Sequence, residues 1–128
     1  MFTRNRFAEM SATLAIAICS ALAAGSALAA DFPVGTYTDS EVTLVFDGTG
    51  HFRGSEKNVV KVEGDYTVDG DQLQITDKSG PWACTKATEQ TGTYRWKAEG
   101  NALTFSKVAD ACKDRVGSLT PRAWKKAG

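Results

Sequence analysis

The sequence contains one histidine, His51, and three cysteines among its 128 residues. Serine-type catalytic sets need a histidine beside a nucleophile, and zinc or haem sites need several ligands at defined spacings. His51 stands in Gly50-His51-Phe52, where it points outward if Phe52 points inward, and no CxxC pair is present. We therefore predict no metal, haem or other cofactor, and we place His51 on the surface.

Long blocks of like charge are missing as well, because 15 basic and 15 acidic residues are mixed along the chain. A nucleic-acid-binding protein needs a basic stripe, so we predict no nucleic-acid partner. Carboxylate pairs such as Asp69 with Asp71 lie at turns, whereas a glycosidase pair must face each other across a cleft. The sequence therefore favours a protein that is not an enzyme.

Residues 1–29 predict a secretory signal peptide. Arg4 and Arg6 precede an uncharged, alanine-rich apolar run, and the tripeptide ending at Ala29 fits the small-x-small cleavage rule. Cleavage there leaves one domain, residues 30–128, that is periplasmic or secreted. No later apolar run is long enough to span a membrane. A retained N-terminal anchor is the alternative interpretation.

Two stretches of the chain share one pattern. Each begins Gly-x-Tyr, passes through a turn and alternating apolar residues, and ends at a cysteine: Gly64 to Cys84 and Gly92 to Cys112, both 20 residues apart. A fainter copy begins at Gly35 and lacks the cysteine. Alternation with period two around turns such as Asp-Gly is typical of β-hairpins.

Cleavage after Ala29 removes Cys19 and leaves Cys84 and Cys112 in an oxidising compartment. A single disulfide between them is therefore the prediction. Closing that loop should stabilise the fold by roughly 3 to 4 kcal/mol on the chain-entropy model. Two free thiols acting as a metal or redox pair are the alternative.

From Phe32 onward, short alternating runs are separated by turn signals at intervals of about ten residues. About eight such strands follow in chain order, which predicts an all-β fold, a single antiparallel up-and-down β-barrel that buries its one apolar face. One short helical segment, residues 109–118, precedes the last strand, with Asp110 as its cap and Arg115 on its polar side. An open sandwich is the alternative fold. The positions expected to face inward are Tyr37, Val42, Leu44, Phe46, Phe52, Val60, Val62, Tyr66, Val68, Leu73, Ile75, Tyr94, Trp96, Leu103 and Phe105.

The pattern Gly-x-Tyr-x-Val-Asp-Gly-Asp-x-Leu-x-Ile over residues 64–75 resembles the small bacterial lipocalin-like domains of the calycin group, which are mostly of unknown function. Gly35-Thr36-Tyr37 is similar to the Gly-x-Trp signature of the first lipocalin strand, with tyrosine in place of tryptophan. The resemblance covers roughly residues 32–126. It implies a barrel that binds a small molecule, and a basic residue packed across the signature aromatic, matched by Arg122 or Arg115.

Five aromatic residues are candidates for ligand binding. Buried tyrosine hydroxyls need polar partners, so the inward tyrosines, with Trp96, are candidate contacts at a barrel mouth. Trp82 stands in the longest loop, beside Cys84, where it serves either recognition or as a lid over the mouth. The alternative is that each repeat aromatic packs over a glycine of a neighbouring hairpin. The candidate ligand-binding residues are Tyr37, Tyr66, Tyr94, Trp96 and Trp82.

These observations predict non-catalytic binding of a small apolar or amphipathic molecule at one barrel mouth. A protein-binding barrel, such as a periplasmic protease inhibitor that works through its loops or its N-terminal arm (residues 30–34), is the alternative. A structural envelope protein without a ligand is a third hypothesis.

Overall fold

The computed structural model describes residues 31–120 and 122–127. The expected signal peptide and its cleavage site lie outside the described residues. In chain order the elements are β1 (Gly35–Asp39), β2 (Val42–Phe46), β3 (His51–Glu56), β4 (Val59–Asp69), β5 (Gln72–Ser79), β6 (Thr91–Glu99), β7 (Ala102–Ala109), α2 (Lys113–Leu119) and β8 (Trp124–Lys126).

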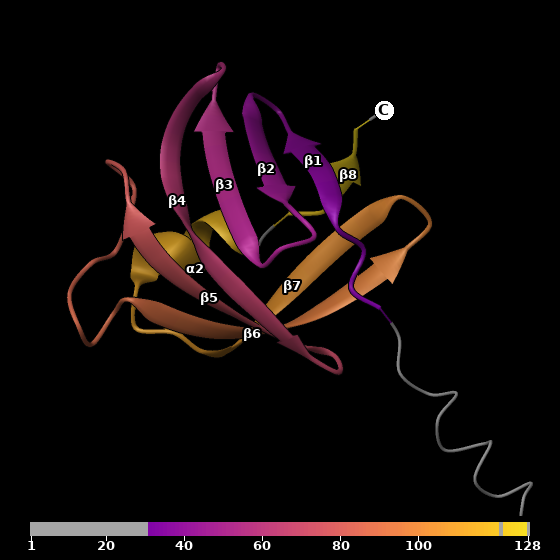
Figure 1. Cartoon of the computed structure of the whole chain (residues 1–128). Coiled ribbons are helices and arrows are strands. Elements are labelled where there is room, and N and C mark those ends of the chain that lie inside the picture. The colour runs from indigo at the N-terminus through magenta and orange to yellow at the C-terminus, as the bar shows by residue number, and fades with distance from the viewer. Residues whose placement is uncertain (1–30, 121, 128) are drawn as a thin grey trace, which may run out of the picture. The chain divides into compact units, whose positions relative to one another are not determined.

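The eight strands form one closed antiparallel barrel, in which each strand pairs with the next along the chain. Figure 1 shows the strands curving in chain order around one interior. The three-residue strand β8 closes the ring because Lys125 pairs both with Ala102 of β7 and with Thr38 of β1. This confirms the predicted all-β, up-and-down barrel with one short helix before the last strand.

The turn residues explain why neighbouring strands fold back directly on each other. Gly70 has φ 62° between β4 and β5, and Gly100 has φ 61° between β6 and β7. A two-residue hairpin turn needs positive φ, which glycine adopts without a Cβ clash. The longer β5–β6 connection, the 80–90 loop, has no such turn and is fixed by other contacts.

The alternation of side chains places most of the predicted inward positions in the core, with Val60 and Val68 as exceptions. On β3 and β4 the register shifts, so that Gly54 pairs with Val62 while the next residue, Ser55, pairs with Val60. This β-bulge gives β4 one extra residue and changes the side that Val60 faces. Val60 and Val68 are both exposed, so the prediction was wrong for these two residues.

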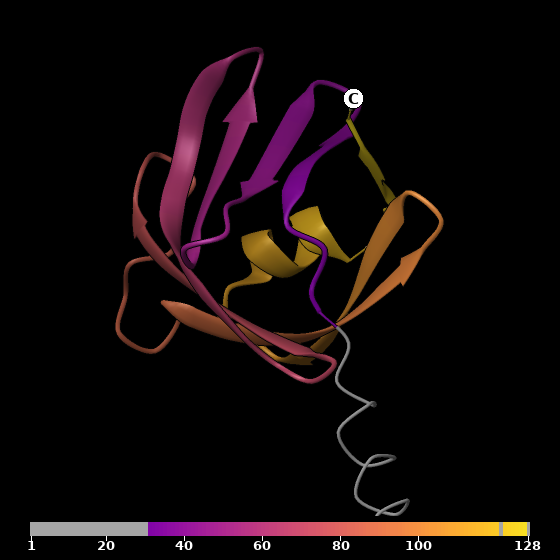
Figure 2. The same ribbon diagram turned by 45° about the vertical axis from the view of Figure 1, so that its right-hand side comes forward.

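One end of the barrel is filled by four aromatic side chains, Phe32, Phe46, Tyr66 and Trp96, which we call the aromatic plug. The Phe32 ring centroid lies 5.0 Å from that of Phe46, 5.7 Å from that of Tyr66 and 5.3 Å from that of Trp96. Residues 31–34, which precede β1, lie at this end (Figure 2). Phe32, only 9% exposed, is therefore a core residue although it belongs to no strand.

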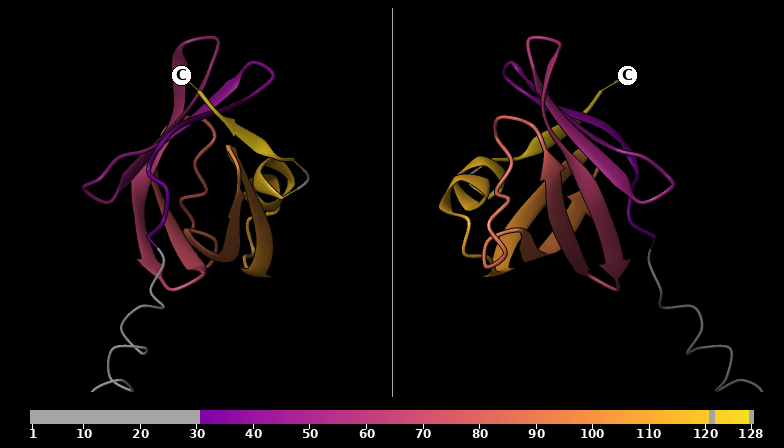
Figure 3. Two further views of the ribbon diagram at one scale, coloured as in Figure 1. Left: turned by 90° about the vertical axis from the view of Figure 1, so that its right-hand side faces the viewer. Right: turned by 60° about the vertical axis from the view of Figure 1, so that its left-hand side comes forward.

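The opposite end, which we call the open end, carries the 80–90 loop and α2. Alternating strand direction brings these two connections to the end away from the aromatic plug. Figure 3 shows α2 beside β7 and β8, with the 80–90 loop next to it. The disulfide between Cys84 and Cys112 joins the loop to the start of α2, as predicted.

Candidate functional site

A cavity of about 640 Å³ lies at the open end. Its deeper walls are apolar and come from β2, β3 and β5, through Leu44, Phe52 and Ile75. The 80–90 loop and α2 form the mouth. Trp82 lines it from the loop, and the loop is held in place by a hydrogen bond from Trp82 N–H to the carbonyl oxygen of Lys61 at 2.9 Å.

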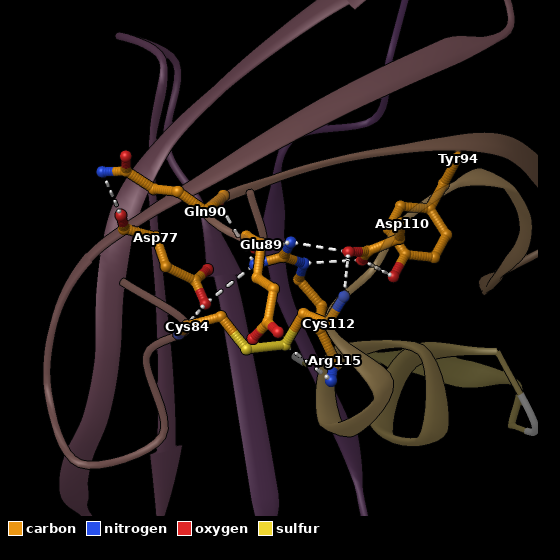
Figure 4. Close-up of a disulfide and its surroundings, with 8 residues drawn as sticks. All are labelled: Asp77, Cys84, Glu89, Gln90, Tyr94, Asp110, Cys112 and Arg115. Carbon is orange, nitrogen blue, oxygen red and sulfur yellow. Dashed lines mark hydrogen bonds and ion pairs between the residues drawn. A yellow bond between two sulfur atoms is a disulfide. The ribbon is translucent and has the colours of Figure 1, made fainter. Parts of the chain in front are cut away.

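The polar wall of the cavity is formed by Asp77 and Arg115, which belong to a charged cluster with the buried carboxylate of Asp110 (Figure 4). Arg115 Nε and Nη2 donate to the two carboxylate oxygens of Asp110 at 2.7 and 2.8 Å. Nη1 lies 2.9 Å from Asp77 Oδ2 and donates to the carbonyl of Gln90 at 3.3 Å, and Nη2 also donates to the carbonyl of Glu89 at 2.7 Å. Four hydrogen bonds and the ion-pair contact with Asp77 therefore engage all three guanidinium nitrogens.

The local sequence explains how Arg115 reaches this position. It lies in the first turn of α2, whose N-cap is Cys112, and the Cys112 sulfur accepts a hydrogen bond from Arg115 N–H at 3.4 Å. The disulfide to Cys84 then fixes the start of the helix against the 80–90 loop. Asp110 Oδ1 accepts from Cys112 N–H at 2.9 Å, so the carboxylate also orients the turn before the helix.

A glycine makes room for the Asp110 carboxylate. A Cβ atom placed on Gly92 would overlap the Asp110 carboxylate. Tyr94, two residues further along β6, donates its hydroxyl hydrogen bond to Asp110 Oδ2. In this Gly-x-Tyr repeat the glycine therefore makes room for the Asp110 carboxylate, and the tyrosine hydroxyl donates a hydrogen bond to it.

The two carboxylates of the cluster differ in pKa. Burial alone would raise the pKa of Asp110, but hydrogen bonds from Arg115, Tyr94 and Cys112 outweigh it and lower that pKa below its usual value. At Asp77 burial dominates and raises the pKa, although Cys84 N–H and Arg115 stabilise the charged form. One guanidinium faces two carboxylates, so the ionised cluster carries one net negative charge.

Of the five predicted ligand-binding residues, Trp82 lines the cavity and is 41% exposed. The other four do not line it, and their polar atoms bond within the protein. Their partners are the carbonyl of Pro33 for Tyr37 (2.7 Å), the carbonyl of Asp47 for Tyr66, the Asp110 carboxylate for Tyr94 and the carbonyl of Gly70 for Trp96 (3.0 Å).

At Gly64 an aromatic ring does pack over the glycine, but it belongs to Phe52 and not to one of the repeat tyrosines. An added Cβ there would lie 2.7 Å from the ring of Phe52, on the neighbouring strand β3, and would overlap the carbonyl oxygen of Thr76. The repeat glycines therefore have different neighbours. Gly64 faces an aromatic ring, whereas Gly92 faces a carboxylate.

Sequence reasoning missed the charged cluster. We expected Asp110 to cap the helix and Arg115 to lie on its polar side, but Cys112 is the cap and Arg115 is buried. One signal was present: Asp77 continues the inward alternation of Leu73 and Ile75 along β5. A carboxylate at an inward position needs a buried partner, and Arg115 is that partner.

The arginine that the lipocalin resemblance matched to the last strand has other contacts. The Arg122 guanidinium lies 5.7 Å from the ring centroid of Trp124 and 3.0 Å from Asp39 Oδ2. Trp124 is buried and lines the cavity beside Arg122. Arg122 therefore belongs to the rim of the open end.

Metal-binding geometry is not found in the part of the chain that the structure describes, where no three His, Cys, Asp or Glu residues are grouped suitably. His51 is exposed, and its Nε2 lies 3.7 Å from Asp65 Oδ1. Among residues 31–120 and 122–127, no helix has the length and apolar character needed to cross a membrane.

Comparisons of the chain with protein-family models, with curated proteins and with solved structures found no match. The architecture itself, a closed eight-stranded antiparallel barrel, is consistent with a lipocalin-like fold.

Proposed function

We propose that this protein is a non-catalytic binding protein of the lipocalin-like type, which takes a small apolar or amphipathic molecule into the open end of its barrel. The observation that carries the proposal is the cavity of about 640 Å³ at that end. Sites for small organic ligands typically have volumes of about 300 to 1,000 Å³, with mostly apolar walls and a few placed polar groups.

The arrangement of the two barrel ends supports this proposal. An eight-stranded barrel is just wide enough to be filled by side chains or to hold one small ligand. Here the aromatic plug fills one end, while Leu44 and Phe52 leave space at the other. Trp82 at the mouth offers a large apolar surface, and aromatic side chains of this kind are strong anchors for bound molecules.

The alternative of a protein-binding inhibitor that works through its N-terminal arm is less well supported. Phe32, in the middle of that arm, packs in the aromatic plug and is not free to reach a partner. Deleting the arm would therefore remove part of the core together with any binding surface. Among the described residues no contact favours the structural envelope hypothesis.

Titration with diphenylhexatriene, a neutral apolar probe that fluoresces when it leaves water, tests the proposal. We expect saturable one-to-one binding to the disulfide-bonded domain. Val62→Trp fills the mouth and should weaken binding by about tenfold or more, because Val62 lines the cavity. Val60→Trp is the matched control, since Val60 is exposed on the same strand. Absent binding, or equal loss in both variants, would contradict the proposal.

A further inference from the structure

Asp77 lines the cavity with one carboxylate oxygen unused. Its Oδ2 accepts from Cys84 N–H at 2.8 Å and lies 2.9 Å from Arg115 Nη1. Its Oδ1 has no hydrogen-bond partner among the described residues, although Asp77 is only 2% exposed. A buried carboxylate oxygen without a donor is energetically unfavourable, so this atom is available to accept a hydrogen bond from a molecule in the cavity.

The deep part of the cavity offers no donor that could serve a negatively charged ligand. All three guanidinium nitrogens of Arg115 are already engaged by Asp77, Asp110 and two loop carbonyls. The cationic groups of Lys113 and Arg122 lie at the mouth, and Arg122 is paired with Asp39. The polar wall therefore presents an acceptor with a net negative charge.

We propose that the cavity selects an amphipathic molecule whose head group donates a hydrogen bond, a primary ammonium or a hydroxyl, to Oδ1 of Asp77, while its apolar body lies against Leu44, Phe52 and Ile75. This rests on the proposed function, and it names the chemical class of the ligand. The ammonium form satisfies the free oxygen and also neutralises the surplus charge of the cluster, so it binds more tightly than the hydroxyl.

Competition between ligands of equal chain length tests the selectivity. Decylamine, decanol and decanoate are each titrated against diphenylhexatriene bound to the wild-type domain at neutral pH. We expect decylamine to bind about tenfold or more tightly than decanoate, with decanol between them. If the neutral probe does not bind, the proposed function fails. If the probe binds but the three decyl ligands displace it equally well, only this inference is overturned.

Asp77→Asn should reverse the order in which the cavity prefers decylamine and decanoate. The amide oxygen takes over the bonds to Arg115 and Cys84 N–H, which leaves the amide NH₂ group facing the cavity as a donor. Decanoate should then bind more tightly than in the wild type, and decylamine more weakly. Asp114→Asn is the matched control, because Asp114 is an exposed carboxylate at the same mouth. An equal shift in both variants would show that rim charge sets the order and would overturn the proposal.

A measurement on the wild-type protein keeps the proposal testable if the Asp77→Asn variant does not fold. The carboxyl carbon of Asp77 in ¹³C-labelled protein should shift on addition of decylamine, and much less on addition of decanoate. The carboxyl carbon of Asp114 is the internal control. Equal shifts for both ligands would overturn the proposal.

Discussion

The Arg115 side chain connects three segments that are far apart in the sequence: the end of β5, the 80–90 loop and the residues between β7 and α2. Its bonds to Asp77, Gln90 and Asp110 cross this whole end of the barrel. Removing Arg115 would leave two buried carboxylates without a compensating cation, and breaking a buried ion pair in this way costs about 3 to 5 kcal/mol. Arg115 thus holds the polar wall of the cavity together.

The opposite pKa shifts of Asp110 and Asp77 give opposite pH dependences of stability. Asp110 has a lowered pKa in the folded state, so the stability from its charge is present at neutral pH and is lost as the pH falls through that pKa. Asp77 has a raised pKa, so the stability associated with its protonated form is present in acid and is lost as the pH rises through that pKa.

We therefore expect Asp110→Asn to be destabilising at pH 7 and to approach the wild type as the pH falls below about 4. Asp77→Asn should show the opposite trend, so that it lowers the free energy of unfolding more in acid than at pH 7. Urea unfolding of the wild type and of each variant between pH 3 and 7 measures these free energies of unfolding. Parallel pH profiles for the two variants would contradict this assignment.

At the scale of single elements, α2 depends on its attachments. Seven residues are too few for a helix that is stable alone in water. Leu119 packs into the core, Val116 packs against it, and Cys112 joins the helix start to the 80–90 loop. The geometry of the cavity mouth therefore depends on the disulfide.

Replacing both Cys84 and Cys112 by alanine should lower the free energy of unfolding by about 3 to 4 kcal/mol, because a link over 28 residues is lost from the unfolded chain. Hydrogen exchange should rise most at the amides of α2 and the 80–90 loop. The paired amides of β2 and β3 should report the loss of global stability, and exchange at the amides of α2 and the 80–90 loop should increase beyond that. An equal increase at all amides would show that the disulfide does not hold this end more than the rest of the barrel.

For the whole molecule, the local patterns predicted the barrel. Alternation and turn glycines are encoded within a few residues, and they predicted the strand order. The disulfide was predicted from the two cysteines that remain once Cys19 is assigned to the signal peptide. The bulge that turns Val60 outward depends on pairing with β3, so the alternation of β4 alone does not reveal it. The pairing of Asp77 with Arg115 joins residues 38 positions apart and depends on barrel closure.

The aromatic plug is a second feature of the whole molecule that sequence patterns missed, because Phe32 lies outside any alternating run. Phe32→Ala should lower the free energy of unfolding by about 3 kcal/mol or more, as expected for removing a buried phenylalanine. Val34→Ala is the control, since Val34 is exposed on the same segment. Thermal and urea unfolding measure the difference, and equal effects of the two changes would show that the plug contributes little.

Since the described aromatic side chains fill one end, the cavity communicates with water through the other. On the proposed function, a bound molecule would have to leave along the path by which it arrived, so the barrel would act as a pouch and not as a channel. Any obstruction of the mouth that does not touch the bound molecule slows association and dissociation by the same factor, because both cross the same barrier. On the proposed function, those parts of the 80–90 loop and α2 that do not contact the ligand would therefore set how long it stays without changing its affinity.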